Sequence, residues 1–396
     1  MSMKSSYLIP ASLLLAASLW ILPAKKVSAR AEYSSASAVL TAESPAVQMI
    51  RAQVAAGGTV TVPTGVHYFY APLVFKQNNT MPTSLVGGGP EVSIMDFSQM
   101  ADTTQTALTV DRQWGYRIQG VTIRGSGATN GGIGIDVNTT TPNANGSYGT
   151  CSGQSVWDHL TIAGFTKGVR IGNRDSYIAA SEMEYRNVKV VMCKTCFELN
   201  DFNTLNHYFT MLQVGQCDYG ILTNGASSVS VNGGSASSVR LSCFMFGSCD
   251  KASVRDFRME ESSNGVTFAT TTTTCQCVLD NCYFHQRAGL NLEDTGNVVK
   301  NAIYLAAGGP CMTLTNCSIN STYTLDTPIL WAHNGNAGAL IVNGGCCSCT
   351  GNLVRVGNLP NLLPGKLAVN NMTRTNSGHV VVPGPNGTGF FDANGQ

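Results

Sequence analysis

Five residues between positions 218 and 287 have side chains suited to acid–base chemistry: Asp218, Glu260, Glu261, His285 and Arg287. Glycoside hydrolysis needs one carboxylic acid to protonate the leaving oxygen and one carboxylate to activate water or to attack. The three acidic residues are candidates for that pair. A β-elimination instead needs a base for the proton beside a uronate carboxylate, with cations or Ca²⁺ to stabilise the enolate. His285 and Arg287 suit that second chemistry.

A second set of side chains can bind a substrate through charge or ring stacking: Lys167, Arg170, Lys194, Glu198 and Tyr219. Each candidate also has a structural interpretation. Arg170 and Glu198 can form a surface ion pair, which is worth under ~1 kcal/mol. Glu260 and Glu261 can form a solvated turn.

The elements that must position these residues belong to a repeat. A Gly or Cys is followed by an apolar residue, any residue and another apolar residue, and successive copies begin 28, 24, 23, 22 and 24 residues apart. The copies start at Gly168, Cys196, Gly220, Cys243, Gly265 and Gly289. Alternation of this kind predicts short strands with one buried face. A period in the twenties predicts a solenoid whose units share one core.

The residue types indicate which kind of solenoid forms. The region is rich in Gly, Ser, Thr, Asn and Val, which favour strands and turns. A polar bend column, with Asn187, Asn281 and Asn316 as well as His159 and Asp256, precedes many strands, and Asn tolerates left-handed backbone angles. We therefore predict an all-β parallel β-helix of two or three strands per coil, rising about 4.8 Å per coil.

On such a coil the middle residue of each motif points outward. The predicted outer column is Arg170, Glu198, Leu222, Met245, Thr267 and Asn291. Asp218 and Glu260 or Glu261 lie two coils apart, about 10 Å along the axis, which is near the separation of ~6.5–9.5 Å in inverting hydrolases. The last of these coils has two possible registers, with the strand either at 289–292 or at 302–305.

The two ends of the chain differ from the repeat. Residues 1–29, with Lys4 and an apolar run from Leu8 to Leu22, predict a signal peptide. Its removal changes the formal charge from +1 to −2, so we expect neither nucleic-acid binding nor stable membrane insertion. The protein is then secreted, extracellular or periplasmic. Residues 30–358 are predicted to form the β-helix, with a cap at about 44–98 that begins with a helix. Residues 359–396 are predicted to be a C-terminal extension.

The cysteines number 14, which in an exported chain favours disulfides. Cys282 and Cys317 take the same offset after a bend asparagine, so we expect them to stack on neighbouring coils. They form either a disulfide or part of a ladder of free buried thiols. The Cys193–Cys196 pair has no His nearby and is not predicted to bind zinc.

The capping segment carries a resemblance to a known family. A helix followed by GGTVTVPTGVHYF (57–69) and SLVGGGPEVSIMDF (84–97) resembles the opening of the pectate-lyase-like superfamily, which includes rhamnogalacturonase-type enzymes and phage tailspikes. The resemblance implies a right-handed parallel β-helix that cleaves a polysaccharide by lyase or hydrolase chemistry, with sugar bound along a sheet. It transfers no catalytic residue, since the paired-Asp, His-Gly and Arg-x-Lys motifs of the polygalacturonase branch are absent.

Together these features predict a secreted carbohydrate-active enzyme that cleaves an extracellular, acidic polysaccharide. The alternative is a non-catalytic cell-surface or carbohydrate-binding β-helix protein. Monomer and trimer both stay open, and Ca²⁺ is expected only for the lyase chemistry.

Overall fold

The computed structural model describes residues 42–76, 82–129, 131–138, 150–172, 179–200, 204–225, 228–268, 275–286, 301–305, 311–321, 328–331, 339–348, 353–356, 367–374 and 381–383. The predicted signal peptide lies outside these residues. Within them, no helix is long and apolar enough to cross a membrane.

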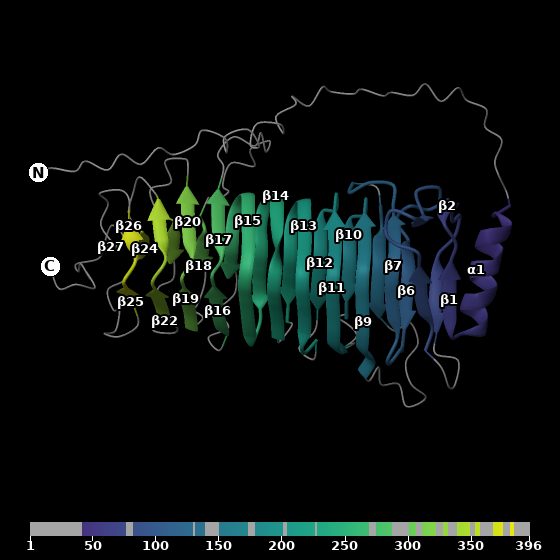
Figure 1. Ribbon diagram of the computed structural model, residues 1–396, viewed down its shortest axis with the longest axis horizontal. Coiled ribbons are helices and arrows are strands. Elements are labelled where there is room, and N and C mark those ends of the chain that lie inside the picture. The colour runs from purple at the N-terminus through teal and green to yellow at the C-terminus, as the bar shows by residue number, and fades with distance from the viewer. Residues whose placement is uncertain are drawn as a thin grey trace, which may run out of the picture. The chain divides into compact units, whose positions relative to one another are not determined.

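A single helix, α1 (Pro45–Ala56), precedes the first coil. The side chain of Ser44 accepts a hydrogen bond from the backbone N–H of Val47, and proline follows at the start of the helix, where its missing N–H costs nothing. Gly57 ends the helix with a φ of 78°, an angle that glycine adopts freely. Val47 and Ile50 are fully buried against the first strands, so α1 covers the open end of the stack (Figure 1).

The rest of the described chain consists of strands that wind in coils, and every pairing between strands of successive coils is parallel (Figure 1). The early strands are β1 (Thr59–Val62), β2 (Gly65–Tyr68), β3 (Leu73–Lys76), β4 (Ser84–Gly87), β5 (Ser93–Asp96), β6 (Thr106–Asp111), β7 (Arg117–Arg124) and β8 (Ile133–Asn138). The middle strands are β9 (Thr150–Ala163), β10 (Lys167–Ile171), β11 (Ala179–Val191), β12 (Thr195–Asn200), β13 (His207–Asn224), β14 (Ser228–Ser248) and β15 (Lys251–Phe268).

The later strands are shorter: β16 (Gln276–Asp280), β17 (Tyr283–Gln286), β18 (Ile303–Leu305), β19 (Cys311–Thr315), β20 (Ser318–Ser321), β21 (Ile329–Trp331), β22 (Ala339–Asn343), β23 (Cys346–Ser348), β24 (Val354–Val356), β25 (Leu367–Asn370), β26 (Thr373–Arg374) and β27 (Val381–Pro383). Each coil contributes to three sheets. Sheet A begins with β1, sheet B with β2 and sheet C with β3, and the long strands turn from one sheet into the next. This is the predicted parallel β-helix.

The interior contains the predicted file of apolar residues. Val169 pairs with Phe197, Phe197 with Ile221, Ile221 with Phe244, and Phe244 with Val266. All five side chains are 1% exposed or less. Side chains far apart in the sequence therefore become neighbours by stacking.

The next coil settles the open register. Val266 pairs with Ile303, so β18 continues sheet C and Tyr304 follows Thr267 in the outer column. The alternative strand at 289–292, and with it Asn291, lies outside the described residues.

From β7 onward, one or two residues with positive φ make the bend from sheet A to sheet B. Asn187, Asn281 and Asn316 have φ of 50–52°, and His159 and Asp256 have φ of 48° and 51°. The side chain of Asn281 donates to Asp256 Oδ1 over 2.6 Å, linking two coils. The bend column is thus structural, as its residue types predict.

The C-terminal boundary predicted from sequence is too early. β25, β26 and β27 pair with β22, β23 and β24, so the solenoid continues past residue 358 to Pro383. The added coil keeps the repeat's pattern, because Val369 is buried and Asn371 occupies the bend with a φ of 53°. Several prolines before it disguise that pattern in the sequence.

Candidate functional site

The outer face of sheet C carries charged side chains in its N-terminal half and apolar ones beyond. Strand register gives the middle row in coil order as Thr109, Asp136, Arg170, Glu198, Leu222, Met245, Thr267 and Tyr304. A second row nearer the strand ends contains Asp111, Asn138, Asn200 and Asn224. Inward-pointing residues alternate with these, which is why polar side chains can gather here without disturbing the core.

Asp136 and Arg170 form the centre of this face. Arg170 Nε lies 2.8 Å from Asp136 Oδ1, and its Nη2 lies 2.6 Å from Oδ2, in a bidentate pair. The hydrogen bond that Arg170 donates to Asp136, together with the charges of Asp136 and Glu198, raises the pKa of Arg170 despite its partial burial. Asp136 is only 4% exposed, so the guanidinium supplies the charge that a buried carboxylate requires.

Glu198 is fixed by one neighbour on the preceding coil and one on its own coil. Lys167 Nζ lies 2.6 Å from Glu198 Oε2, and Asn200 Nδ2 donates to Oε1 over 3.2 Å. Asn224 in turn donates to Asn200 Oδ1 over 3.2 Å. Two predicted binding residues, Lys167 and Glu198, are therefore in direct contact, and the asparagines orient the carboxylate.

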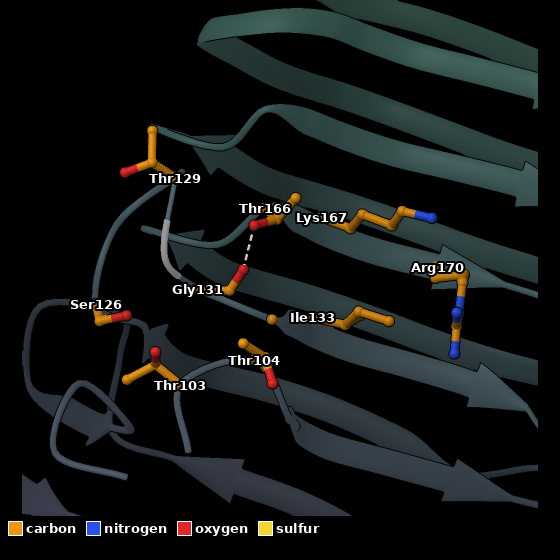
Figure 2. A pocket seen from close by; sticks show the side chains of 10 residues that line it. Thr103, Thr104, Ser126, Thr129, Gly131, Ile133, Thr166, Lys167 and Arg170 are labelled. Carbon is orange, nitrogen blue, oxygen red and sulfur yellow. Dashed lines mark hydrogen bonds between the residues drawn. The ribbon is translucent and has the colours of Figure 1, made fainter. Parts of the chain in front are cut away.

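A cavity of about 700 Å³ opens beside Lys167 and Arg170 (Figure 2). Its wall combines hydroxyl side chains and glycine backbone from three coils, with Lys167 and Arg170 on one side: Thr103, Thr104, Ser126, Thr129, Gly131, Gly132, Ile133 and Thr166 complete it. Thr166 Oγ1 donates to the carbonyls of Gly131 and Ala128, the latter over 3.1 Å, and fixes the loop that forms the wall. A hydroxyl-rich cavity of this size suits a sugar.

Beyond Glu198 the outer face becomes less polar. Leu222, Met245 and Tyr304 are partly exposed in the middle row. Tyr219, a predicted binding residue, is also partly exposed, and its burial and the nearby charge of Asp218 raise the pKa of its phenol. Partly exposed apolar and aromatic side chains next to a polar cavity can pack against the faces of sugar rings.

Asp218 and Lys194 lie at the turn from sheet B to sheet C rather than on the outer face of sheet C. Arg240, one coil further, contacts Asp218 with its Nη2 and Nε at 2.5 and 2.6 Å. The backbone N–H of Asp218 donates to the carbonyl of Lys194 over 2.9 Å. The charge of Asp218 is thus already balanced by Arg240 within a turn.

The structure places Glu260 and His285 on the outer face of sheet B, away from Arg170. They pair in register between β15 and β17. Arg258 forms an ion pair with Glu260, and its guanidinium lies 5.0 Å from the ring centre of Tyr283. The predicted pairing of Asp218 with Glu260 is therefore wrong, because residues at similar offsets before a motif fall on different sheets.

Glu261 is a bend residue with a φ of 51° between sheets B and C. Its Oε2 accepts a hydrogen bond from Ser238, the bend residue of the preceding coil, over 3.2 Å. Arg287 lies outside the described residues. Among those described, no three His, Cys, Asp or Glu side chains are grouped as a metal site, and the Ca²⁺ expectation stays a prediction.

Sequence reasoning missed Asp111 and Asp136. The signal was present, because Gly134-Ile135-Asp136-Val137 has the form of the repeat, with Asp136 at the outward position. That copy starts 34 residues before Gly168, outside the spacing of the others, since a long connection separates β8 from β9.

Comparison with known proteins agrees with this architecture. No protein-family model and no curated protein matches the sequence. Among solved structures, the chain is similar to the catalytic domain of a GH87 alpha-1,3-glucanase in complex with nigerose, with a TM-score of 0.56 and 12% identity over 83% of this chain and 63% of that one. A variant of such a domain, in complex with tetrasaccharides, gives a TM-score of 0.55 and 11% identity with the same coverage.

The enzymatically active domain of bacteriophage CBA120 tailspike protein 2 also matches, with a TM-score of 0.44, 13% identity and coverage of 77% and 44%. The chain spans less than two thirds of the length of the glucanase domain, and these identities establish the fold alone. This chain is a parallel β-helix structurally similar to right-handed β-helix proteins that act on carbohydrates. The resemblance drawn from the capping segment is confirmed at the level of fold.

Proposed function

We propose that this protein is a secreted glycoside hydrolase that cleaves a neutral polysaccharide on the outer face of sheet C. The observation that carries the proposal is the pair of outward-facing carboxylates Asp111 and Asp136, which are 5% and 4% exposed, with Asp136 held by Arg170 of the cavity wall. Distant structural neighbours crystallised with nigerose and tetrasaccharides support a carbohydrate ligand.

Carboxylate spacing favours this pair over the alternatives. Asp111 stacks on Asn138, and Asp136 lies two residues before Asn138 on the same strand. Such diagonal neighbours have Cα atoms about 8 Å apart, from a rise of ~3.3 Å per residue and a strand spacing of ~4.8 Å. That spacing is close to the ~6.5–9.5 Å between the carboxyl groups of an inverting pair. Asp136 and Glu198 are two coils apart, about 10 Å, with Arg170 between them.

The contacts assign a role to each carboxylate. Arg170 holds both oxygens of Asp136, and a guanidinium in this geometry pairs with an ionised carboxylate. Asp136 is therefore the base that orients a water, and Asp111 the acid that protonates the leaving oxygen. Lys167, Arg170 and Glu198 position the reacting groups and contact sugar hydroxyls.

The charge balance favours a neutral substrate over the acidic one expected from the sequence. From β6 to β12 this face carries the carboxylates of Asp111, Asp136 and Glu198 and the cations of Lys167 and Arg170, both of which are ion-paired. A uronate-cleaving lyase needs positive charge beside the substrate carboxylate. Here each cation of the face is already matched by a carboxylate of the protein.

The test measures new reducing ends and unsaturated products from a panel of neutral and uronic-acid polysaccharides. We expect reducing ends from a neutral glucan, without the ultraviolet absorbance of an unsaturated product. Asp111→Asn and Asp136→Asn should each lower the rate by about 10²–10⁴-fold. Asp218→Asn is the matched control, because that carboxylate is paired with Arg240 at a turn.

A non-catalytic carbohydrate-binding protein is the second candidate. The observation that favours it is that both oxygens of Asp136 and both of Glu198 already accept hydrogen bonds from the protein. Binding of oligosaccharides without any product across the panel would establish this function and contradict hydrolysis.

A further inference from the structure

Two buried thiols occupy equivalent places in adjacent coils. Strand register between β17 and β20 sets Cys282 beside Cys317, as the sequence predicts, and they are 1% and 2% exposed. Cys282 Sγ donates to the carbonyl of Val254 over 3.3 Å, and Cys317 Sγ to that of Leu279 over 3.5 Å. Val254 and Leu279 are themselves paired, so the two sulfurs sit at the same corner one coil apart.

In the structure both cysteines are free thiols. Each sulfur is therefore available to bond to the other.

We infer that Cys282 and Cys317 form a disulfide when the chain folds under oxidising conditions. Stacked backbones are about 4.8 Å apart, inside the Cα separation of ~4.4–6.8 Å that a disulfide tolerates. The two thiols lose two protons and two electrons and form one S–S bond. The oxidant is a small-molecule disulfide such as oxidised glutathione, whose own S–S bond is cleaved to two thiols.

Burial decides when the bond forms. Oxidised glutathione is far larger than a water molecule and cannot approach sulfurs that have at most 2% exposure. Oxidation therefore takes place during folding, before successive coils close over one another, and folded reduced protein resists it.

The experiment refolds the full chain from reduced, denatured protein, once with reductant and once with a mixture of reduced and oxidised glutathione. Remaining thiols are then alkylated under denaturing conditions, and the protein is digested without reductant for mass spectrometry. We expect a linked 282–317 peptide only after oxidative refolding, and a higher Tm for that sample. Cys311 and Cys346, which are exposed, serve as alkylated internal controls.

Cys282→Ala and Cys317→Ala should each remove the 282–317 peptide and the Tm increase. Because either variant alone tests the bond, misfolding of one leaves the other informative. Complete alkylation of Cys282 and Cys317 after oxidative refolding would overturn the inference. Linkage to other partners, or oxidation of the folded reduced protein at the same rate, would also overturn it.

Discussion

Acid should destabilise this protein through one buried histidine. His207 is fully buried, with its Nε2 3.1 Å from the carbonyl of Ala180 and its Nδ1 3.1 Å from the hydroxyl of Tyr185. The carbonyl can only accept, so Nε2 carries the proton and Nδ1 accepts from the tyrosine. The neutral ring satisfies both partners, and a second proton would have no acceptor.

Burial lowers the pKa of His207 from 6.5 to about 4. Above pH 6.5 the ring is neutral in the folded and the unfolded chain, and pH has no effect through this residue. Between pH 6.5 and about 4 the unfolded chain binds a proton that the folded chain does not, so the free energy of unfolding falls as pH falls. At 1.36 kcal/mol per pKa unit, the loss is about 3 kcal/mol by pH 4.

The assay is urea unfolding at a series of pH values for the wild type and for His207→Gln. Glutamine retains a donor and an acceptor but does not titrate. The difference in unfolding free energy between the two proteins should change by about 3 kcal/mol from pH 7 to pH 4 and stay constant above pH 7. A difference that is the same at every pH would refute the reasoning, because His207 would then be protonated equally in both states.

Three other perturbations have defined outcomes. Arg170→Met should lower the free energy of unfolding by about 2–3 kcal/mol in thermal or urea unfolding, because buried Asp136 loses its counter-charge. Adding Asp136→Asn should recover part of that loss. An equal or greater loss in the double variant would contradict the pairing. Met211→Asn should raise stability by about 0.5–1 kcal/mol, since Met211 holds a φ of 55° with its side chain half exposed, and a lower urea midpoint would show that its packing outweighs the backbone cost. Asp136→Asn alone should abolish product release while calorimetry still detects oligosaccharide binding, and unchanged turnover would remove Asp136 from the mechanism.

The coil architecture was readable from the sequence because its signals are local. Alternation identified Val169 and Val266 as inward residues, and a bend asparagine identified the start of sheet B. Both depend on residues within a few positions of each other, which is the range over which the pleat and the bend are set.

The site was not readable to the same extent, because it depends on which of three sheets a residue joins. Glu198 and Arg170 were found because they lie inside the motif. Glu260 and His285 were assigned to the wrong face, since their distance before the next motif does not reveal where sheet B ends. Asp136 was missed because a long connection shifted its copy of the repeat.

The short bend between sheets A and B affects how this scaffold can be modified. Because the bend hardly varies, the strands of those two sheets keep the same register from coil to coil. Coils therefore differ in length at the other corners. The connection from sheet C to the next coil is long in one place, from Asn138 to Thr150, and short in another, from Asn224 to Ser228. Those connections begin at the edge of sheet C where Asp111 and Asn200 lie. Foreign loops grafted there would reshape the rim of the sugar site while the stack beneath kept its spacing.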